Sequence, residues 1–208
     1  MGLKNLTSKI VDGKLEEAVS ITANAINNSI SPIKIMEYMV AGMDEIGARF
    51  EDGKAYVPNL LMSSRAMKGC LKLIGPLLKE AGAKPKGKVV IGTIKGDLHD
   101  IGKNILAAML EGAGFEIINL GVDVSPEKFA ETAKNEDAEI IAVSALLTTT
   151  MINMKAVVEA CETLGIRDQV KIIVGGAPLS QKYCDSIHAD GYSSNGNGAV
   201  RLAKELVS

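Results

Sequence analysis

One of the two histidines in the sequence stands where a ligand could be bound. His99 follows an apolar run at residues 89–92, lies two residues after Asp97 and three before Gly102, and precedes a helical pattern at residues 105–110. Imidazole is a common metal ligand and acid–base group. At the mouth of a strand–loop–helix unit, it is placed to bind a ligand at the edge of a sheet. A lone histidine is more commonly a hydrogen-bonded surface residue, so its neighbours must decide between the two roles.

The composition limits the class of protein. The 208 residues are 47% hydrophobic and 3% aromatic, with a formal charge of −2. Basic residues do not outnumber acidic ones, which argues against nucleic-acid binding, and the few aromatic residues argue against base stacking. No apolar run reaches the ~18 residues of a membrane span, and the first residues lack the apolar segment of a signal peptide. Cys70, Cys161 and Cys184 form no CxxC pair, which indicates buried thiols in a reducing cytosol, so we expect a cytoplasmic protein without membrane contact.

The hydrophobic pattern divides the chain into two parts. Residues 1–84 place apolar side chains at helical spacing, and breaks at residues 12–14, 31–32 and 51–54 separate about four helices. This pattern predicts a four-helix bundle domain over residues 1–84. The stretch 82–87 has the composition of a linker. A second domain is therefore expected over residues 85–208.

The second part alternates short apolar strands with helices. Strands are expected at residues 88–93, 116–120, 139–144, 171–174 and 191–193, with helices near 103–113, 125–135, 150–164, 179–187 and 196–207. This alternation predicts a doubly wound parallel sheet with right-handed crossovers. Five strands favour the flavodoxin-like (Rossmann-like) order 2-1-3-4-5. The expected fold class is thus a helical bundle cap followed by a five-stranded α/β domain.

In such a sheet, ligands bind at the carboxyl ends of the strands. Small and hydroxylated residues follow three further strands, at 144–150, 175–176 and 194–196. Each loop alone has an ordinary explanation, such as a helix N-cap for the threonines or a tight turn for the glycines. Together at one edge, they predict a groove for a ligand with a long apolar or ring-like part. The motifs GxGxxG and GxxxxGK[ST] are absent, which disfavours a dinucleotide or a nucleoside triphosphate.

Three motifs at these strand ends resemble the cobalamin-binding pattern of corrinoid proteins: Asp97-x-His99-x-x-Gly102, Ser144-x-Leu146 and Gly175-Gly176. In the helical part, residues 42–47, 50–54 and 56–58 resemble the helical cap that precedes the cobalamin domain of methionine synthase and of small methyltransferase corrinoid proteins. The resemblance covers nearly the whole chain. It is strongest to the stand-alone corrinoid proteins of methylamine, quaternary-amine and methanol metabolism in methanogens and acetogens.

The resemblance implies a cobalamin or related corrinoid cofactor, as cob(I)alamin or methylcob(III)alamin. His99 would be the axial cobalt ligand in place of the cofactor's own base. Asp97 would accept a hydrogen bond from the other ring nitrogen, and Thr150 would place a hydroxyl behind Asp97, where methionine synthase has serine. The other implied cofactor contacts are Leu98, Asp100, Ile101, Gly102, Ser144, Leu146, Thr148, Gly175, Gly176 and Gly196, with Phe50 and Val57 of the cap shielding the methyl group.

The same resemblance implies a methyl carrier that has no catalytic activity alone. A substrate-specific methyltransferase would pass a methyl group from a methylated amine, or another methyl donor, to Co(I). A second methyltransferase would move it to coenzyme M or tetrahydrofolate, and a reductive activase would be a third partner. Because each transfer needs access to cobalt, the cap would move about a hinge at residues 79–88.

Two other cobalamin-dependent functions stay open. An adenosylcobalamin-dependent mutase subunit has the same fold but seldom carries this helical cap. A cobalamin sensor or regulator would need a DNA-binding segment, and residues 1–30 contain no basic recognition helix. A phospho-receiver of the same fold is disfavoured, because Ser144 stands where the acceptor aspartate would be.

Overall fold

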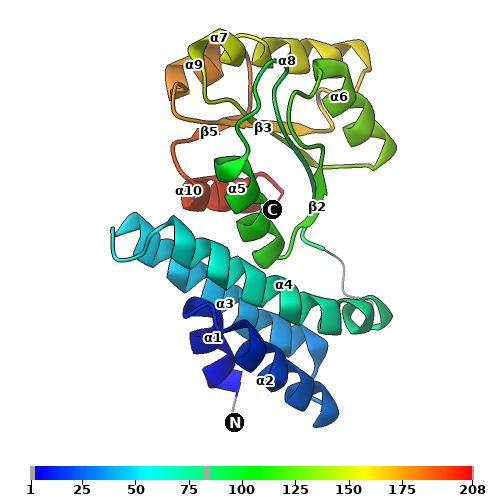
Figure 1. The fold of residues 1–208 in the computed structure, drawn as a ribbon. Coiled ribbons are helices and arrows are strands. Elements are labelled where there is room, and N and C mark those ends of the chain that lie inside the picture. Colours follow the sequence, from blue (N-terminus) through cyan, green and yellow to red (C-terminus); the bar gives the residue numbers. More distant parts are fainter. Residues whose placement is uncertain (1–2, 82–84, 208) are drawn as a thin grey trace. The chain divides into compact units, whose positions relative to one another are not determined.

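The computed structural model describes residues 3–81 and 85–207, which form two compact units (Figure 1). The first unit runs to Pro85 and includes Gly112–Gly114, and the second contains the remaining residues from Lys86 on. Residues 82–84, which belong to the predicted linker and hinge, lie outside the described residues. The division into domains 1–84 and 85–208 therefore stays a prediction.

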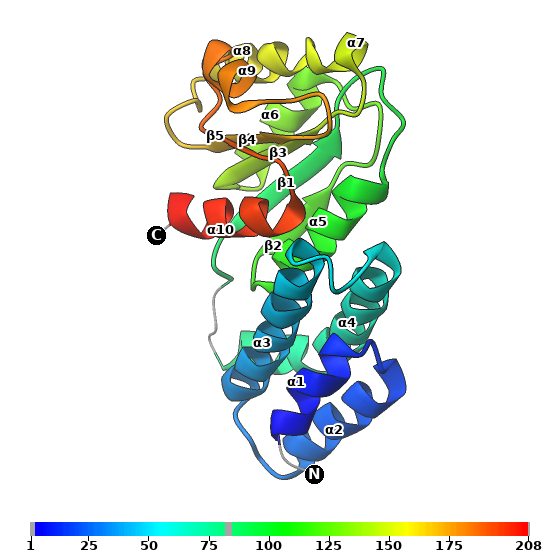
Figure 2. The same cartoon turned by 90° about the vertical axis from the view of Figure 1, so that its left-hand side faces the viewer.

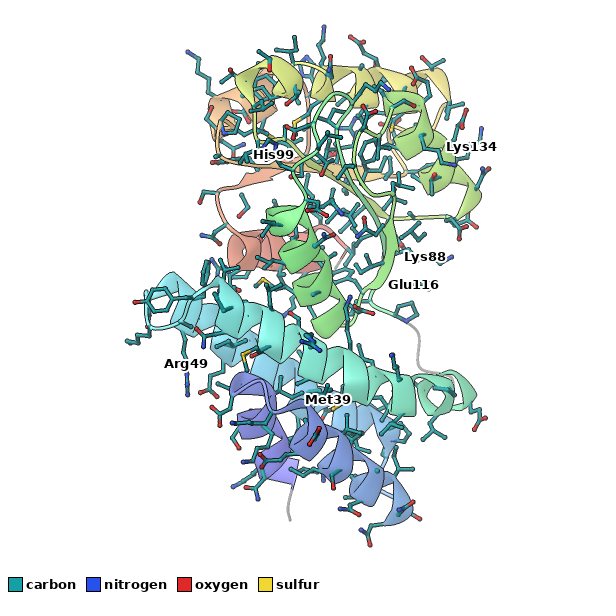
Figure 3. All side chains as sticks on the ribbon, in the orientation of Figure 1. Met39, Arg49, Lys88, His99, Glu116 and Lys134 are labelled. Atoms are coloured by element: carbon teal, nitrogen blue, oxygen red, sulfur yellow. The ribbon has the colours of Figure 1, made fainter. Side chains whose placement is uncertain are left out.

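The first unit is a helical bundle. Its described helices are α1 (Leu3–Val11), α2 (Leu15–Asn27), α3 (Pro32–Glu51) and α4 (Val57–Glu80). Met39 is fully buried inside the bundle, whereas Arg49 points outward (Figure 3). Gly13 makes the turn between α1 and α2 at φ +65°, and a Cβ there would lie 2.5 Å from the Cβ of Met62. Glycine is therefore needed where this turn meets α4.

The second unit is built on a parallel sheet of five strands in the order β2-β1-β3-β4-β5 (Figure 2). The strands are β1 (Lys88–Thr93), β2 (Glu116–Asn119), β3 (Ile140–Ser144), β4 (Lys171–Gly175) and β5 (Gly191–Ser193). Lys88 pairs with Glu116 at the amino ends of β1 and β2, and His99 lies toward the opposite, carboxyl edge (Figure 3). The order of the strands puts the switch in direction between β1 and β3, where this fold places its ligands.

Helices cover both faces of this sheet (Figures 1 and 2). The helices are α5 (Ile101–Gly112), α6 (Pro126–Asn135), α7 (Thr148–Met151), α8 (Met154–Thr163), α9 (Gln181–Ser186) and α10 (Gly196–Leu206). One face packs Val90, Ile141 and Ile172 into a core with α6, α8 and α9. Because side chains alternate along a strand, the neighbouring residues point to the other face, which α5 and α10 cover.

The predicted fold class is confirmed, and the element boundaries differ from the expected ones by a few residues. One difference matters for the site: the helix expected at 150–164 is two helices, α7 and α8, with a break at Ile152 and Asn153. Two hydrogen bonds to distant residues lie at this break, from the Tyr183 hydroxyl to the Met151 carbonyl and from the side-chain amide of Asn153 to the Lys95 carbonyl.

Three smaller expectations have clear outcomes. Ser31 occupies the N-cap position of α3, before Pro32, but its side chain makes no capping hydrogen bond. Cys70, Cys161 and Cys184 are buried free thiols, as expected. In the described part of the chain, no helix combines the length and the apolar character that crossing a membrane requires.

Candidate functional site

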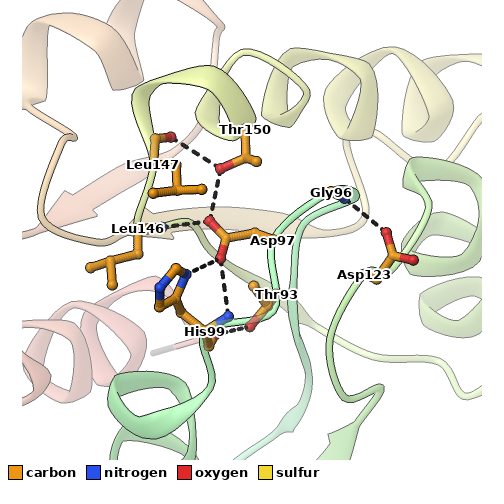
Figure 4. A network of polar contacts seen from close by, with 8 residues as sticks. All are labelled: Thr93, Gly96, Asp97, His99, Asp123, Leu146, Leu147 and Thr150. Atoms are coloured by element: carbon orange, nitrogen blue, oxygen red, sulfur yellow. Dashed lines mark hydrogen bonds and ion pairs between the residues drawn. The ribbon is translucent and has the colours of Figure 1, made fainter.

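The loop after β1 is held in place from both sides. On one side, the Ile94 amide donates to the Ser144 carbonyl at 3.0 Å. On the other side, the Gly96 amide donates to the Asp123 carboxylate at 2.8 Å (Figure 4). The Asp123 amide in turn donates to the Asp97 carbonyl at 3.0 Å. Gly96 makes the turn at φ +87°, which glycine adopts without strain. This loop therefore presents Asp97 and His99 in a fixed conformation.

Asp97 is the centre of the polar network in Figure 4. Its side chain is fully buried. One carboxylate oxygen accepts a hydrogen bond from the backbone amide of His99 at 3.1 Å and lies 2.7 Å from Nδ1 of the His99 ring. The other accepts from the Leu146 amide at 2.8 Å and from the Thr150 hydroxyl at 2.7 Å. Burial opposes ionisation, but these donors together outweigh it and hold the pKa of Asp97 far below its usual range.

The geometry of this pair leaves one imidazole nitrogen of His99 free to bind a ligand. An ionised carboxylate can only accept hydrogen bonds, so the proton between Asp97 and His99 lies on Nδ1. The lone pair of a neutral ring is then on Nε2. The side chain of His99 is 51% exposed, in contrast to the fully buried Asp97. Asp97 thus fixes the orientation of the His99 ring through Nδ1, and Nε2 remains free to bind a ligand. Metal-binding histidines are usually held by a carboxylate in this way.

Thr150 holds Asp97 from the opposite side. It is buried in α7, and its hydroxyl lies 2.7 Å from the Asp97 carboxylate and 3.0 Å from the Leu147 carbonyl. A hydroxyl has one proton, so these two acceptors compete for it. The short contact and the ionised partner favour Asp97.

An apolar cavity of about 470 Å³ opens beside His99. Its floor is the side of the sheet that carries Ile91, Ala142 and Ile173, and its walls include Leu106 of α5 and Leu202 of α10. A cavity of this size with a mainly hydrophobic lining is typical of a site for an organic ligand or cofactor. The cavity lies at the strand ends where the groove was predicted, and residues of α5 and α10 are part of its lining.

Glycines in this lining serve two different purposes. Gly176 has φ +135°, and a Cβ there would lie 1.8 Å from the Ala145 carbonyl oxygen, so packing alone requires glycine. At Gly175 a Cβ would meet only the Ser193 carbonyl at 3.5 Å, an ordinary contact, and at Gly102 it would meet nothing within 4 Å. Gly102 therefore leaves open space that a ligand can use, whereas Gly175 already lies in ordinary contact distance of the neighbouring strand.

Most of the predicted site residues line this one cavity. They are Leu98, His99, Asp100, Ile101, Gly102, Ser144, Leu146, Gly175, Gly176 and Gly196. Asp97 and Thr150 lie behind His99, whereas Thr148 is exposed at the start of α7 and is not among the lining residues. Phe50 in α3 and Val57 at the start of α4 belong to the helical unit.

Sequence reasoning missed Lys103, which also lines the cavity. Its side chain is 3% exposed, and its ammonium donates to the Asn104 and Asn119 side chains at 2.6 and 2.8 Å. Burial lowers the pKa of Lys103, and Asp100 partly opposes this shift. Residues 103 and 106 are three positions apart, so they share one face of the helix that follows the His99 motif. Because that face borders the predicted groove, the spacing could have identified Lys103 as a lining residue.

The charged state of Asp97 predicts a pH dependence of stability in the absence of cofactor. Its pKa is lower in the folded protein than in the unfolded chain, so its contribution is complete above about pH 4 and is lost as the pH falls further. We expect Asp97→Asn to cost about 2 kcal/mol of unfolding free energy at pH 7, because buried donors lose a charged acceptor.

Below about pH 4, the difference between wild type and Asp97→Asn should shrink by about 1.4 kcal/mol per pH unit. Urea unfolding of both proteins at several pH values measures this difference. Glu131→Gln on an exposed position of α6 is the control, with no change expected at any pH. A difference that stays constant into the acid range contradicts the assignment of a charged, network-bound Asp97.

The residues of this site fit a corrinoid. Among the described residues, no cluster of three or more His, Cys, Asp and Glu side chains could enclose a metal ion. Cobalt in a corrin ring brings most of its ligands with it and would need only His99 from this site. The apolar cavity and the open space at Gly102 suit the organic part of such a cofactor.

Comparisons with known proteins agree with this fit. Residues 87–201 and residues 3–75 each match a family model described as a B12 binding domain. The chain is 40% identical to the dimethylamine corrinoid protein of Methanosarcina barkeri over 99% of this chain and 97% of that protein. It is 42% identical to trimethylamine corrinoid protein 1 of Methanosarcina acetivorans over 95% of this chain and 93% of that protein.

Two solved structures share the whole architecture. A cobalamin-binding protein from Desulfitobacterium hafniense has a TM-score of 0.82 at 27% identity, with full coverage of both chains. The methanol:cobalamin methyltransferase complex of Methanosarcina barkeri contains a chain with a TM-score of 0.84 at 28% identity, over 97% of this chain and 78% of that one. The chain belongs to the family of corrinoid proteins with B12-binding domains, and its cofactor is cobalamin or a related corrinoid.

Proposed function

We propose that this corrinoid protein carries a methyl group between two methyltransferases. The observation that carries the proposal is His99, which is half exposed, lines an apolar cavity and is oriented by the buried carboxylate of Asp97. When bound, the corrinoid supplies a cobalt centre that takes up a methyl group in the Co(I) state and gives it up again. The protein supplies the axial ligand, the binding groove and the protection from solvent.

The proposed roles of the residues follow from their contacts. His99 presents Nε2 to the metal, and Asp97 holds the proton on Nδ1. Thr150 and the Leu146 amide keep Asp97 ionised and in place. A carboxylate held in this way would strengthen the donor character of the imidazole, and at 2.7 Å from Nδ1 it is near enough to share a proton with the ring.

Apart from Thr148, the remaining predicted contacts divide between the groove and the cap. The groove residues, including Gly102, Gly175 and Ser144, are proposed to hold the organic tail of the cofactor. Phe50 and Val57 of the helical unit are proposed to shield the methyl group, in line with the family resemblance. Apolar shielding would exclude water and oxygen from a reactive centre.

Methylated amines are the proposed methyl donors. The relatives at 40% and 42% identity are named for dimethylamine and trimethylamine, and the similar solved complex pairs its corrinoid chain with a methanol:cobalamin methyltransferase. We propose a substrate-specific methyltransferase as the first partner and a second methyltransferase, with coenzyme M or tetrahydrofolate as acceptor, as the next. A reductive activase would restore the Co(I) state after oxidation.

Reconstitution tests this function. The apo-protein should bind methylcobalamin, and purified partner methyltransferases should transfer the methyl group to coenzyme M or tetrahydrofolate with dimethylamine, trimethylamine or methanol as donor. Gly102→Val should weaken methylcobalamin binding by about 10-fold or more, because its side chain enters the groove. Gly75→Val is the matched control, since it is also a helical glycine whose Cβ would meet nothing within 4 Å, but it lies in α4 outside the lining.

Two results would contradict the proposal. Productive binding of adenosylcobalamin alone would favour a mutase subunit. Equal loss of methylcobalamin binding in Gly102→Val and Gly75→Val would show that the cavity beside His99 is not the binding groove.

A further inference from the structure

Tyr183 connects α9 to the short helix that carries Thr150. Its hydroxyl donates to the carbonyl oxygen of Met151 at 2.5 Å, and its ring packs against the buried core of the sheet domain. Burial raises the pKa of Tyr183, so the hydroxyl keeps its proton and remains a donor. The contact spans 32 positions in the sequence and reaches the residue next to Thr150.

The helix α7 depends on such contacts because it has only four residues, Thr148–Met151. A helix of this length has little stability of its own. Its N-cap residue, Leu147, offers no side-chain hydrogen bond. The segment is held at its start by the bond from the Leu146 amide to Asp97, and at its end by Tyr183 and by the bond from Asn153 to the Lys95 carbonyl at 3.0 Å.

The position of α7 decides which acceptor receives the Thr150 proton. The Asp97 carboxylate is 2.7 Å from the hydroxyl, and the Leu147 carbonyl is 3.0 Å from it. Because the two distances differ by so little, a small displacement of α7 would turn the proton from Asp97 to Leu147. Asp97 would then lose one of the donors that keep it in place behind His99.

We propose that Tyr183 is a positioning residue for the cobalt ligand, acting through Met151, Thr150 and Asp97. It holds the end of α7 so that the Thr150 hydroxyl remains on Asp97. The inference rests on the proposed role of His99 as the axial ligand. Tyr183 itself does not line the cavity, so its effect must pass through the helix that it anchors.

Hydrogen exchange of the apo-protein tests the anchoring step without any cofactor. Tyr183→Phe removes the hydroxyl and keeps the ring, so the fold should be retained. Exchange of the Met151 and Leu146 amides should become faster by roughly 10-fold, the effect of one lost hydrogen bond. The control is Tyr192→Phe, because Tyr192 packs against the same core and its hydroxyl makes no hydrogen bond within the described residues. Unchanged exchange in Tyr183→Phe, or an equal change in Tyr192→Phe, would overturn the inference.

A double-mutant cycle tests the connection to the ligand. Methylcobalamin dissociation constants and absorption spectra would be measured for Tyr183→Phe, Thr150→Val and the double variant. We expect Tyr183→Phe to weaken binding about 3- to 10-fold and Thr150→Val about 10-fold or more. The double variant should be no weaker than Thr150→Val, because both changes remove the same interaction.

Independent, additive effects would show a merely structural role for Tyr183. If wild-type protein binds with a histidine nitrogen on cobalt and Tyr183→Phe behaves like Tyr192→Phe, the inference fails while the proposed function stands. If wild-type protein has no histidine nitrogen on cobalt, the proposed role of His99 fails and takes this inference with it.

Discussion

Replacing His99 by alanine is expected to remove the protein's nitrogen ligand from cobalt and to slow methyl transfer by roughly 100-fold or more. His99 lines the cavity, and its Nδ1 is paired with Asp97, which leaves Nε2 available. Electron paramagnetic resonance of bound cob(II)alamin measures the ligand directly. In wild type with natural histidine, the axial nitrogen should split each cobalt line into a triplet.

Labelling the histidines with nitrogen-15 distinguishes the protein from the cofactor's own base. The triplet should become a doublet in labelled wild type, because nitrogen-15 has a nuclear spin of one-half whereas natural nitrogen has a spin of one. His99→Ala should lose the protein-derived splitting. His188→Asn is the control, since His188 lies near β5 at φ 59°, a conformation that asparagine tolerates. A triplet that persists in labelled wild type would mean that the cofactor's base stays on cobalt and that His99 is no ligand.

Replacing Gly176 by alanine is expected to destabilise the sheet domain by roughly 3 kcal/mol and to abolish tight cobalamin binding. The added Cβ would lie 1.8 Å from the Ala145 carbonyl oxygen, and φ +135° is strained for any residue with a side chain. Relief requires the loops after β3 and β4 to move apart. Leu146, whose amide holds Asp97, follows Ala145 directly, so the movement should also disturb the network behind His99.

Gly175→Ala is the matched control for the stability part of this prediction. Its Cβ would make an ordinary contact at 3.5 Å with the Ser193 carbonyl, so we expect a loss of stability below about 1 kcal/mol. Thermal and urea unfolding of the apo-proteins, followed by methylcobalamin titration, measure both effects. Equal stability of the two variants would refute the packing argument. Full cobalamin affinity in Gly176→Ala would refute the link between this loop and the site.

The local features of the site could be predicted because they depend on short stretches of chain. Asp97 and His99 are two residues apart in one loop, so their pairing needs little more than an extended backbone. The strands were predictable for a similar reason. The buried central strands of a parallel sheet are continuous apolar runs, and each is followed by a loop at the same edge.

The features that were missed depend on contacts between distant residues. The break between α7 and α8 lies at hydrogen bonds that reach from Tyr183 to Met151 and from Asn153 to Lys95. Helical periodicity across this region contains no sign of either bond. The burial of Lys103 likewise depends on Asn119 at the end of β2, which accepts its ammonium proton.

The sequence by itself determined the two-part organisation, the order of strands and helices, and the residue types at each strand end, because these follow from local periodicity and turn chemistry. Only the tertiary structure decided which loop residues meet. It buries Asp97 completely, leaves His99 half exposed and brings Thr150 from another strand end to within 2.7 Å of the carboxylate. Burial and hydrogen-bond distance are properties of the packed sheet, so the electrostatic state of this site arises only when the strand ends come together.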